Sequence, residues 1–246
     1  MKIFVKWFIE IQNNLMNLFN HENEMSGTNI DKTIFYYDKI AKDYDKEIQR
    51  DFNKEVRTGV KNYVLSISGI TSLLDFGAGT GGDLNWQLEA GFLITFYEPS
   101  KNMASIAERS YNLRNQELVK TLIGEKANYI SLKEEGKKDL IFSNFAAINS
   151  VKNIEELFTI FSSIINNEGH LIIVAYLPKS KRFLSDFFSF TKEMTIAFGN
   201  STFQMTAYLH SSKRLVTKAK KNRLLLIKKM VLGDSGFILY HFKKTA

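Results

Sequence analysis

The chain has 246 residues, of which 44% are apolar and 24% are charged, and this composition is typical of a soluble globular protein with a sizeable core. It contains no cysteine, which excludes disulfide scaffolds, thiolate metal sites and cysteine nucleophiles. The four histidines are scattered without metal-ligand spacing, so we expect no metal site.

The net charge of +7 is concentrated at the C-terminal end. Residues 211–246 hold ten of the 33 basic residues and one of the 26 acidic residues, which leaves 23 basic and 25 acidic groups in residues 1–210. Such a tail can bind RNA or an anionic membrane surface, or it can be a solvated face. We favour the solvated face, because no aromatic residues are interleaved for base stacking. The lysines expected to be exposed include Lys220, Lys221, Lys243 and Lys244.

The N-terminal 19 residues are predicted to form an amphipathic helix. Helical i, i+3/i+4 spacing relates Phe4, Phe8, Ile11, Leu15 and Leu18. Charged residues interrupt the apolar run, so it does not resemble a signal peptide, and no segment reaches the ~20 apolar residues of a membrane span. We expect this helix to dock on its own domain or on a second copy in a homodimer, and we expect the protein to be cytoplasmic.

Helical and extended patterns then follow in chain order. Helices are predicted from Asp31 to Ile48 and over 54–66. Short apolar runs predict strands at 72–76, 93–97, 118–123, 139–143 and 170–177, with helices from Asp83, at 103–113 and at 154–165 between them. This alternation predicts βαβ units and a mostly parallel sheet.

Two segments follow the last of these strands. Residues 178–203 are rich in phenylalanine and are predicted to form a helical cap, or simply a helix with an apolar core face. In the tail, strands at 223–231 and 237–243 flank a Gly-Asp-Ser-Gly turn and predict an antiparallel hairpin at the sheet edge. The expected division is N-terminal helices in 1–52, a core in 53–177, a cap in 178–210, and a helix with the hairpin in 211–246.

The glycine-rich turn LLDFGAGTGGD at residues 73–83 is the most informative segment. Glycines between a strand and a helix let the backbone approach a ligand, and the helix offers free N–H groups. Gly77, Gly79 and Gly82, with Glu98 as a ribose-binding acid, also fit a dinucleotide-binding fingerprint. Three features argue against NAD. Asp75 within the strand suits a cationic ligand rather than a pyrophosphate, and Gly81 keeps the turn open where the phosphates would pack. About seventy residues precede the motif, whereas a NAD domain usually opens with its first strand.

Successive motifs resemble those of the class I S-adenosylmethionine-dependent methyltransferases. LLDFGAGTGG is similar to the first motif of that family, FYEPS at 96–100 to the second, IGEKA at 123–127 to the third and DLIFSNF at 139–145 to the fourth. YDKIAKDYD at 37–45 resembles the upstream lid helix, and NNEGHLIIV at 166–174 departs from the family pattern only in a turn. The resemblance covers about residues 35–177.

The resemblance implies a fold, a cofactor and its contacts. The fold is α/β, a Rossmann-like, doubly wound, mostly parallel seven-stranded sheet with an antiparallel C-terminal hairpin edge, N-terminal helices and a small helical cap. The cofactor is S-adenosyl-L-methionine. Glu98 would accept hydrogen bonds from both ribose hydroxyls, Asp75 from the methionine ammonium, and Glu125 from the adenine amino group. The full set of implied contacts is Tyr44, Asp75, Gly77, Ala78, Gly79, Glu98, Pro99, Met103, Glu125, Lys126, Asn144 and Phe145.

The acceptor is expected to be a small, apolar or aromatic molecule methylated at O or N, because the cap is rich in phenylalanine. Methyl transfer needs a general base only for a protonated nucleophile, and His210 is the candidate, although a lone histidine can equally be structural. The residues after Asn144 lack the Pro-Pro-aromatic form of amino-group methyltransferases that act on nucleic acids. An RNA methyltransferase using the basic tail and a non-catalytic binding module remain the alternatives.

Overall fold

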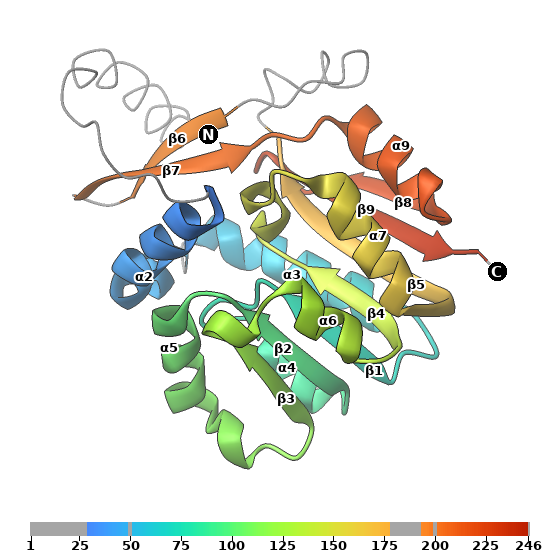
Figure 1. The fold of residues 1–246 in the computed structure, drawn as a ribbon, viewed down its shortest axis with the longest axis horizontal. Helices are drawn as coiled ribbons and strands as arrows, with labels where there is room; N and C mark the ends of the chain where they lie inside the picture. The colour runs from blue at the N-terminus through green and yellow to red at the C-terminus, as the bar shows by residue number, and fades with distance from the viewer. Residues whose placement is uncertain (1–28, 49–50, 178–192, 199–200, 246) are drawn as a thin grey trace.

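A seven-stranded sheet forms the centre of the structure (Figure 1). A computed structural model describes residues 29–48, 51–177, 193–198 and 201–245. The amphipathic helix predicted for the N-terminus, its suggested dimer contact and the phenylalanine stripe predicted within 178–192 lie outside the described residues. No helix in the described part is long and apolar enough to cross a membrane.

The sheet has the order β3-β2-β1-β4-β5-β9-β8. Its first five strands are parallel and comprise β1 (Ser72–Phe76), β2 (Leu93–Glu98), β3 (Val119–Ile123), β4 (Lys138–Ser143) and β5 (Ile165–Tyr176). The antiparallel hairpin of β8 (Leu224–Val231) and β9 (Phe237–Lys244) completes the sheet beside β5. The Rossmann-like sheet with its hairpin edge is therefore confirmed.

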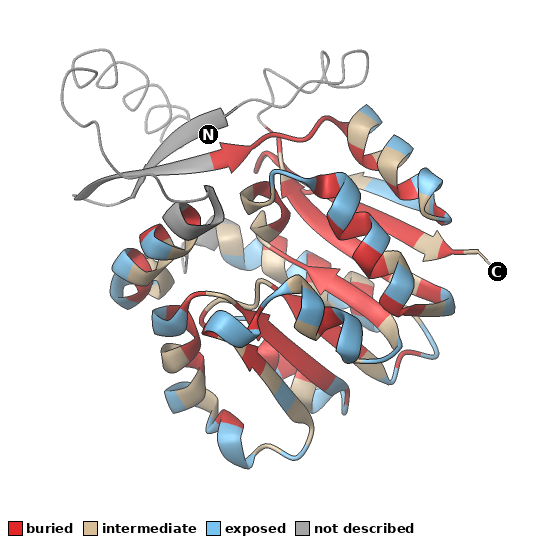
Figure 2. Cartoon of the chain, viewed as in Figure 1, coloured by how far each residue is buried: buried red, intermediate tan, exposed pale blue. Residues whose placement is uncertain are grey.

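Helices cover both faces of this sheet, because side chains alternate along buried strands. Leu73 and Leu140 pack towards α3 (Asp51–Leu65), α4 (Leu84–Glu89) and α5 (Lys101–Tyr111). Their neighbours Leu74 and Ile141 pack towards α6 (Tyr129–Glu134), α7 (Ile154–Ile164) and α9 (Ser212–Lys221). Figure 2 shows the result, with buried strands between helices that are buried on one side and exposed on the other.

The segment expected to be a helical cap contains strands in its described part. β6 (Glu193–Phe198) and β7 (Ser201–Tyr208) form an antiparallel ribbon, and β7 packs against α2 (Asn29–Ile48) (Figure 1). The helical prediction is therefore wrong for residues 193–198 and 201–203. Helical spacing of phenylalanines indicated a helix only for the residues before this ribbon.

One lysine of the basic tail is not exposed. The Lys244 side chain is 8% exposed, and its Nζ donates hydrogen bonds to the carbonyls of Ser162 (2.7 Å) and Ile165 (3.0 Å). Those carbonyls end α7, where a helix attracts a cation. The expectation that Lys244 is a solvated surface charge is therefore wrong.

A chain of hydrogen bonds joins β9 of the hairpin to β5 on one side and to α3 on the other. His241 Nε2 lies 2.9 Å from His170 Nδ1, and His241 Nδ1 lies 2.8 Å from the Tyr63 hydroxyl. Burial, His170 and nearby lysines lower the pKa of His241 to about 4, and burial also lowers the pKa of His170. Both imidazoles are therefore neutral in the folded protein near pH 7.

Lowering the pH from 7 to 5 is expected to cost about 1–2 kcal/mol of stability through His241. Histidines of the unfolded chain bind protons below about pH 6.5 while the folded one stays neutral, so this stability is lost as the pH falls towards 4. Urea unfolding of the wild type and of His241→Gln at both pH values measures the effect. An equal pH dependence in the two proteins would exclude it.

Candidate active site

The carboxyl ends of β1, β2 and β4 open into a cavity of about 650 Å³. β1 lies between β2 and β4, at the point where the strand order reverses, and open α/β sheets bind ligands at this position. The glycine turn and the loops after β2, β3 and β4 line the cavity, together with side chains of α2 and α3. This position makes it the candidate active site.

The glycine turn fits closely against the loop after β4. Gly77 has a left-handed φ of 74°, and a Cβ atom there would lie 2.5 Å from the Cβ of Ala147 in the short helix η4 (Ala147–Ser150). A side chain at residue 77 would thus separate the first and fourth motifs. The turn and the β4 loop consequently form one continuous part of the cavity wall.

Glu98 is buried at the end of β2 with both carboxylate oxygens fixed. Oε2 accepts a hydrogen bond from the Gly79 amide and Oε1 from the Ser100 amide, each at 2.8 Å. Burial raises the pKa of Glu98 to about 7, and these two amides oppose the rise. Each oxygen keeps a lone pair for a further donor, so the side chain can accept from two adjacent hydroxyls of a ligand.

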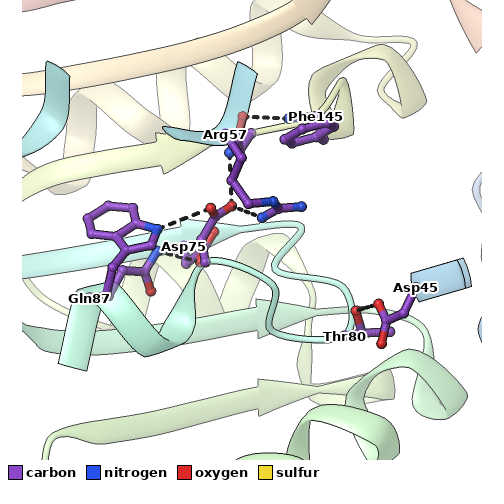
Figure 3. A network of polar contacts seen from close by, with 9 residues as sticks. Asp45, Arg57, Asp75, Thr80, Gln87 and Phe145 are labelled. Carbon is purple, nitrogen blue, oxygen red and sulfur yellow. Dashed lines mark hydrogen bonds and ion pairs between the residues drawn. The ribbon is translucent and has the colours of Figure 1, made fainter. Parts of the chain in front are cut away.

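Asp75 is a second buried carboxyl that lines the cavity. Its side chain is 3% exposed, and Gln87 Nε2 donates to Oδ2 at 2.7 Å (Figure 3). Burial and the nearby Asp83 raise the pKa of Asp75 to about 8. A cationic ligand group would favour its ionised form, so this part of the cavity suits an ammonium.

Arg57 is a cavity residue that no sequence motif predicts. It extends from α3 so that Nη1 lies 2.7 Å from Asp83 Oδ2, and its guanidinium lies 4.4 Å from the ring centroid of Phe145 (Figure 3). A Cβ atom on Gly82 would lie 2.9 Å from Nη1, so this glycine leaves space for the arginine. Asp83 directly follows the glycines in the sequence, which could have indicated a cation beside the turn. Nothing in the sequence indicates that Arg57 supplies that cation.

Asp83 has further hydrogen-bond partners beneath the cavity. Asn144 Nδ2 donates to Oδ2 at 2.8 Å, and Trp86 Nε1 donates to Oδ1 at 3.1 Å. Asp83 thus connects α3, the turn and the β4 loop through one carboxylate. With the cation of Arg57, this network compensates the negative charge of Asp83.

The β4 loop holds two consecutive residues in the left-handed conformation. Phe145 has φ 44° and Ala146 has φ 63°. The Ala146 amide donates to the Val174 carbonyl at 2.9 Å, and the Phe145 ring packs edge-on against Phe237 at 5.2 Å. Surrounding contacts hold this strained pair, of which Phe145 lines the cavity, and such strain is characteristic of functional loops.

Two tyrosines of α2 line the cavity from the opposite side. Tyr37 lines the cavity together with Ser150 of η4. The Tyr44 ring lies 3.9 Å from the position that a Cβ atom on Gly79 would occupy. Both rings therefore belong to the candidate site.

Two aspartates fix α2 to the loops beneath it. Asp38 accepts a hydrogen bond from Ser100 Oγ at 2.6 Å, beside Glu98. Asp45 accepts one from Thr80 Oγ1 at 2.5 Å, within the glycine turn (Figure 3). These contacts hold α2 against both loops that follow β1 and β2.

Most of the site residues expected from the sequence lie together around this cavity. They are Tyr44, Asp75, Gly77, Ala78, Gly79, Glu98, Pro99, Met103, Asn144 and Phe145.

Glu125 and Lys126 are not among the residues that line the cavity. β3 is followed by a 3₁₀ turn, η3 (Gly124–Lys126), and the Glu125 side chain is 90% exposed, 2.8 Å from Lys101 Nζ. Glu125 therefore lies outside the cavity lining in this structure, and its expected contact with the adenine stays a prediction. The residues that line this end instead are Ala127, Asn128, Tyr129 and Ile130.

His210 also lies outside the cavity lining. It is 2% exposed, its Nε2 donates to the Val151 carbonyl at 2.7 Å, and burial lowers its pKa to about 4. A buried imidazole bonded to the backbone cannot reach a substrate proton from this position. In this conformation His210 has a structural role, contrary to its candidacy as a general base.

The strand order, the acid-bearing glycine turn and the fixed glutamate at the end of β2 together define a class I methyltransferase. A sequence profile described as a methyltransferase domain matches residues 36–214. The chain therefore belongs to this family, and the resemblance to S-adenosylmethionine-dependent methyltransferases is confirmed. No match was found among curated protein sequences.

Solved structures share the fold at low sequence identity. N-methyltransferase NodS from Bradyrhizobium japonicum WM9, in complex with S-adenosylhomocysteine, has a TM-score of 0.65 at 12% identity over 87% of this chain and 100% of its own. The 1,6-didemethyltoxoflavin-N1-methyltransferase of Burkholderia thailandensis has a TM-score of 0.61 at 12% identity, over 92% and 94%. An S-adenosylmethionine-dependent methyltransferase from Clostridium acetobutylicum ATCC 824 has a TM-score of 0.60 at 15% identity, over 86% and 100%.

Proposed function

We propose that the cavity binds S-adenosylmethionine and that the protein transfers the methyl group to O or N of a small, apolar or aromatic molecule. The observation that carries the proposal is the pair of buried carboxyls, Asp75 and Glu98, on either side of the glycine turn in one 650 Å³ cavity. The Burkholderia thailandensis structure, solved with bound 1,6-didemethyltoxoflavin and S-adenosylhomocysteine, supports a small acceptor by analogy.

The polar groups of the cavity fit this cofactor. The free lone pairs of Glu98 match the ribose diol, and Asp75 matches the methionine ammonium. Arg57 uses Nη1 for Asp83 and retains further N–H groups for the methionine carboxylate. The cofactor's ammonium and carboxylate thus meet opposite charges, and its adenine matches the end of the cavity lined by Asn128 and Tyr129.

When bound, the cofactor supplies a methyl group on a sulfonium, which is already activated for in-line displacement. The chain supplies position and excludes water. The Phe145–Ala146 loop is held by the hydrogen bond from the Ala146 amide to the Val174 carbonyl, while Tyr37 and Tyr44 line the cavity from α2. Rate enhancement then comes from alignment of the acceptor with the methyl group. An acceptor that arrives deprotonated needs no general base.

The contacts of the lysines in the basic tail favour a small acceptor over RNA. Lys244 is buried, Lys243 lies 2.7 Å from Glu168, and Lys218 and Lys221 pair with Glu155. β5 and β9 also separate the edge strand β8 from the strands around the cavity. These four lysines therefore contact groups of the protein itself, away from the cavity, and are less available to bind RNA.

Methyl transfer from tritiated S-adenosylmethionine to cell extract tests the acceptor class. We expect label in the small-molecule fraction, unchanged when the exposed lysines Lys213 and Lys220 are replaced by glutamine, because solvated charges contribute little. RNA labelled by the wild type but not by this variant would overturn the choice of a small acceptor.

A further inference from the structure

A buried glutamine contacts the carboxyl of Asp75 from outside the cavity. Gln87 lies in α4, the helix that follows the glycine turn, and its side chain is fully buried. Its Nε2 donates a hydrogen bond to Asp75 Oδ2 at 2.7 Å (Figure 3). Asp75 lines the cavity, whereas Gln87 is not among the lining residues. The glutamine therefore acts on a ligand of the cavity through Asp75.

The hydrogen bond from Gln87 leaves the second oxygen of Asp75 for a ligand. Gln87 donates to Oδ2, and none of the residues that the structure describes donates a hydrogen bond to Oδ1. An N–H group bonded to one carboxylate oxygen fixes the orientation of the other oxygen. The carboxylate is thus held in place with an acceptor available for an ammonium group.

The amide of Gln87 is only partly satisfied. Its Oε1 is buried and has no hydrogen-bond partner among the described residues. A buried polar atom without a partner costs stability, and an apolar side chain of the same length avoids this cost. The hydrogen bond to Asp75 is therefore the interaction that an amide supplies at this position and that a methionine does not.

The charges around Asp75 give this hydrogen bond its importance. Burial raises the pKa of Asp75 to about 8, and the negative charges of Asp83 and Glu98 add to the rise. The hydrogen bond from Gln87 and the cation of Arg57 oppose it, and the hydrogen bond has the larger effect of the two. Arg57 is also paired with Asp83. Gln87 is thus the stronger of the two groups that favour ionised Asp75.

We propose that Gln87 is a positioning residue for cofactor binding, which holds the Asp75 carboxylate ionised and oriented toward the methionine ammonium. The proposal rests on the proposed function, because it requires an ammonium group in the cavity. A carboxyl that binds an ammonium must first lose its proton, so a group that favours the ionised form raises the affinity. Gln87 has this effect without contact with the cofactor.

Gln87→Met removes the hydrogen-bond donor and keeps the length of the side chain. We expect S-adenosylhomocysteine to bind this variant about tenfold more weakly than the wild type at pH 7, because a lost hydrogen bond to a charged group shifts its ionisation by about that factor. At pH 9.5 Asp75 is largely ionised in both proteins, so we expect affinities within about twofold of each other. Calorimetry in buffers of different ionisation enthalpy measures the affinity and the protons released, and we expect the variant to release more protons at pH 8.

Two further variants separate this role from packing. Asn85, on the exposed side of α4, donates from Nδ2 to Glu89 Oε1 at 2.7 Å, so Asn85→Met is the matched control with wild-type affinity at both pH values. Gln87→Glu is the conservative variant. When protonated, its carboxyl can still donate to Asp75, so we expect at least about a third of the wild-type affinity at pH 7.

Four results would overturn this proposal and leave the proposed function intact. They are wild-type affinity of Gln87→Met at pH 7, a loss as large at pH 9.5 as at pH 7, a matching loss in Asn85→Met, and a loss of more than about threefold in Gln87→Glu at pH 7. The last result decides the question if Gln87→Met does not fold. If the wild type binds no S-adenosylhomocysteine at any of these pH values, the proposed function is wrong and this proposal falls with it.

Discussion

S-adenosylhomocysteine should bind Glu98→Ala about 30- to 150-fold more weakly than the wild type. Both oxygens of Glu98 are fixed by backbone amides and each keeps a lone pair for the ribose diol. Loss of such charge-assisted hydrogen bonds costs about 2–3 kcal/mol. The amides of Gly79 and Ser100 also lose their hydrogen-bond acceptor in this variant, which adds to the loss of affinity in the folded protein.

Glu125→Ala is the matched control, measured by calorimetry at pH 8. Its carboxylate is exposed and paired with Lys101, so we expect wild-type affinity. Unchanged affinity in a folded Glu98→Ala variant would remove Glu98 from the ribose role. A loss in Glu125→Ala would return the adenine contact to Glu125.

Arg57→Met is expected to lower the free energy of unfolding by about 3 kcal/mol. Asp83 and Asp75 are both buried. Arg57 forms an ion pair with Asp83 and favours the ionised form of Asp75. Removing one partner leaves an uncompensated buried charge, which is a strongly destabilising change. The variant also loses the contact of the guanidinium with Phe145.

The double variant Arg57→Met/Asp83→Asn distinguishes charge from packing. An asparagine at residue 83 can still accept a hydrogen bond from Trp86 or from Asn144, but not from both, so we expect only part of the stability to return. We expect no recovery of S-adenosylhomocysteine affinity, because the partner of the methionine carboxylate remains absent. Urea unfolding and calorimetry measure the two quantities. A double variant no more stable than Arg57→Met would show that Arg57 stabilises by packing alone.

The parts of the site that were predictable lie at the ends of successive strand–helix units. Asp75, Gly77 and Gly79 follow one apolar run, and Glu98 ends the next. Parallel pairing places the carboxyl ends of such strands at one edge, so local sequence was sufficient to bring these residues together. The same reasoning predicted every strand of the seven-stranded sheet.

The parts that were not predictable depend on tertiary contacts. Arg57 reaches Asp83 from a helix that precedes the sheet, and no sequence spacing encodes that approach. Glu125 turns outward because of a 3₁₀ turn, and His210 becomes buried against Val151 only in the assembled fold.

Calorimetric titration with S-adenosylhomocysteine at pH 8 and pH 6 tests the central claim most directly. Burial raises the pKa of Glu98 to about 7 and that of Asp75 to about 8, so at pH 6 both carboxyls are largely protonated before binding. Both carboxyls must ionise to accept hydrogen bonds from the ribose hydroxyls and from the ammonium. We therefore expect a single binding site, proton release on binding, and an affinity at least tenfold weaker at pH 6 than at pH 8. Absence of binding, or the same affinity at both pH values, would contradict the account.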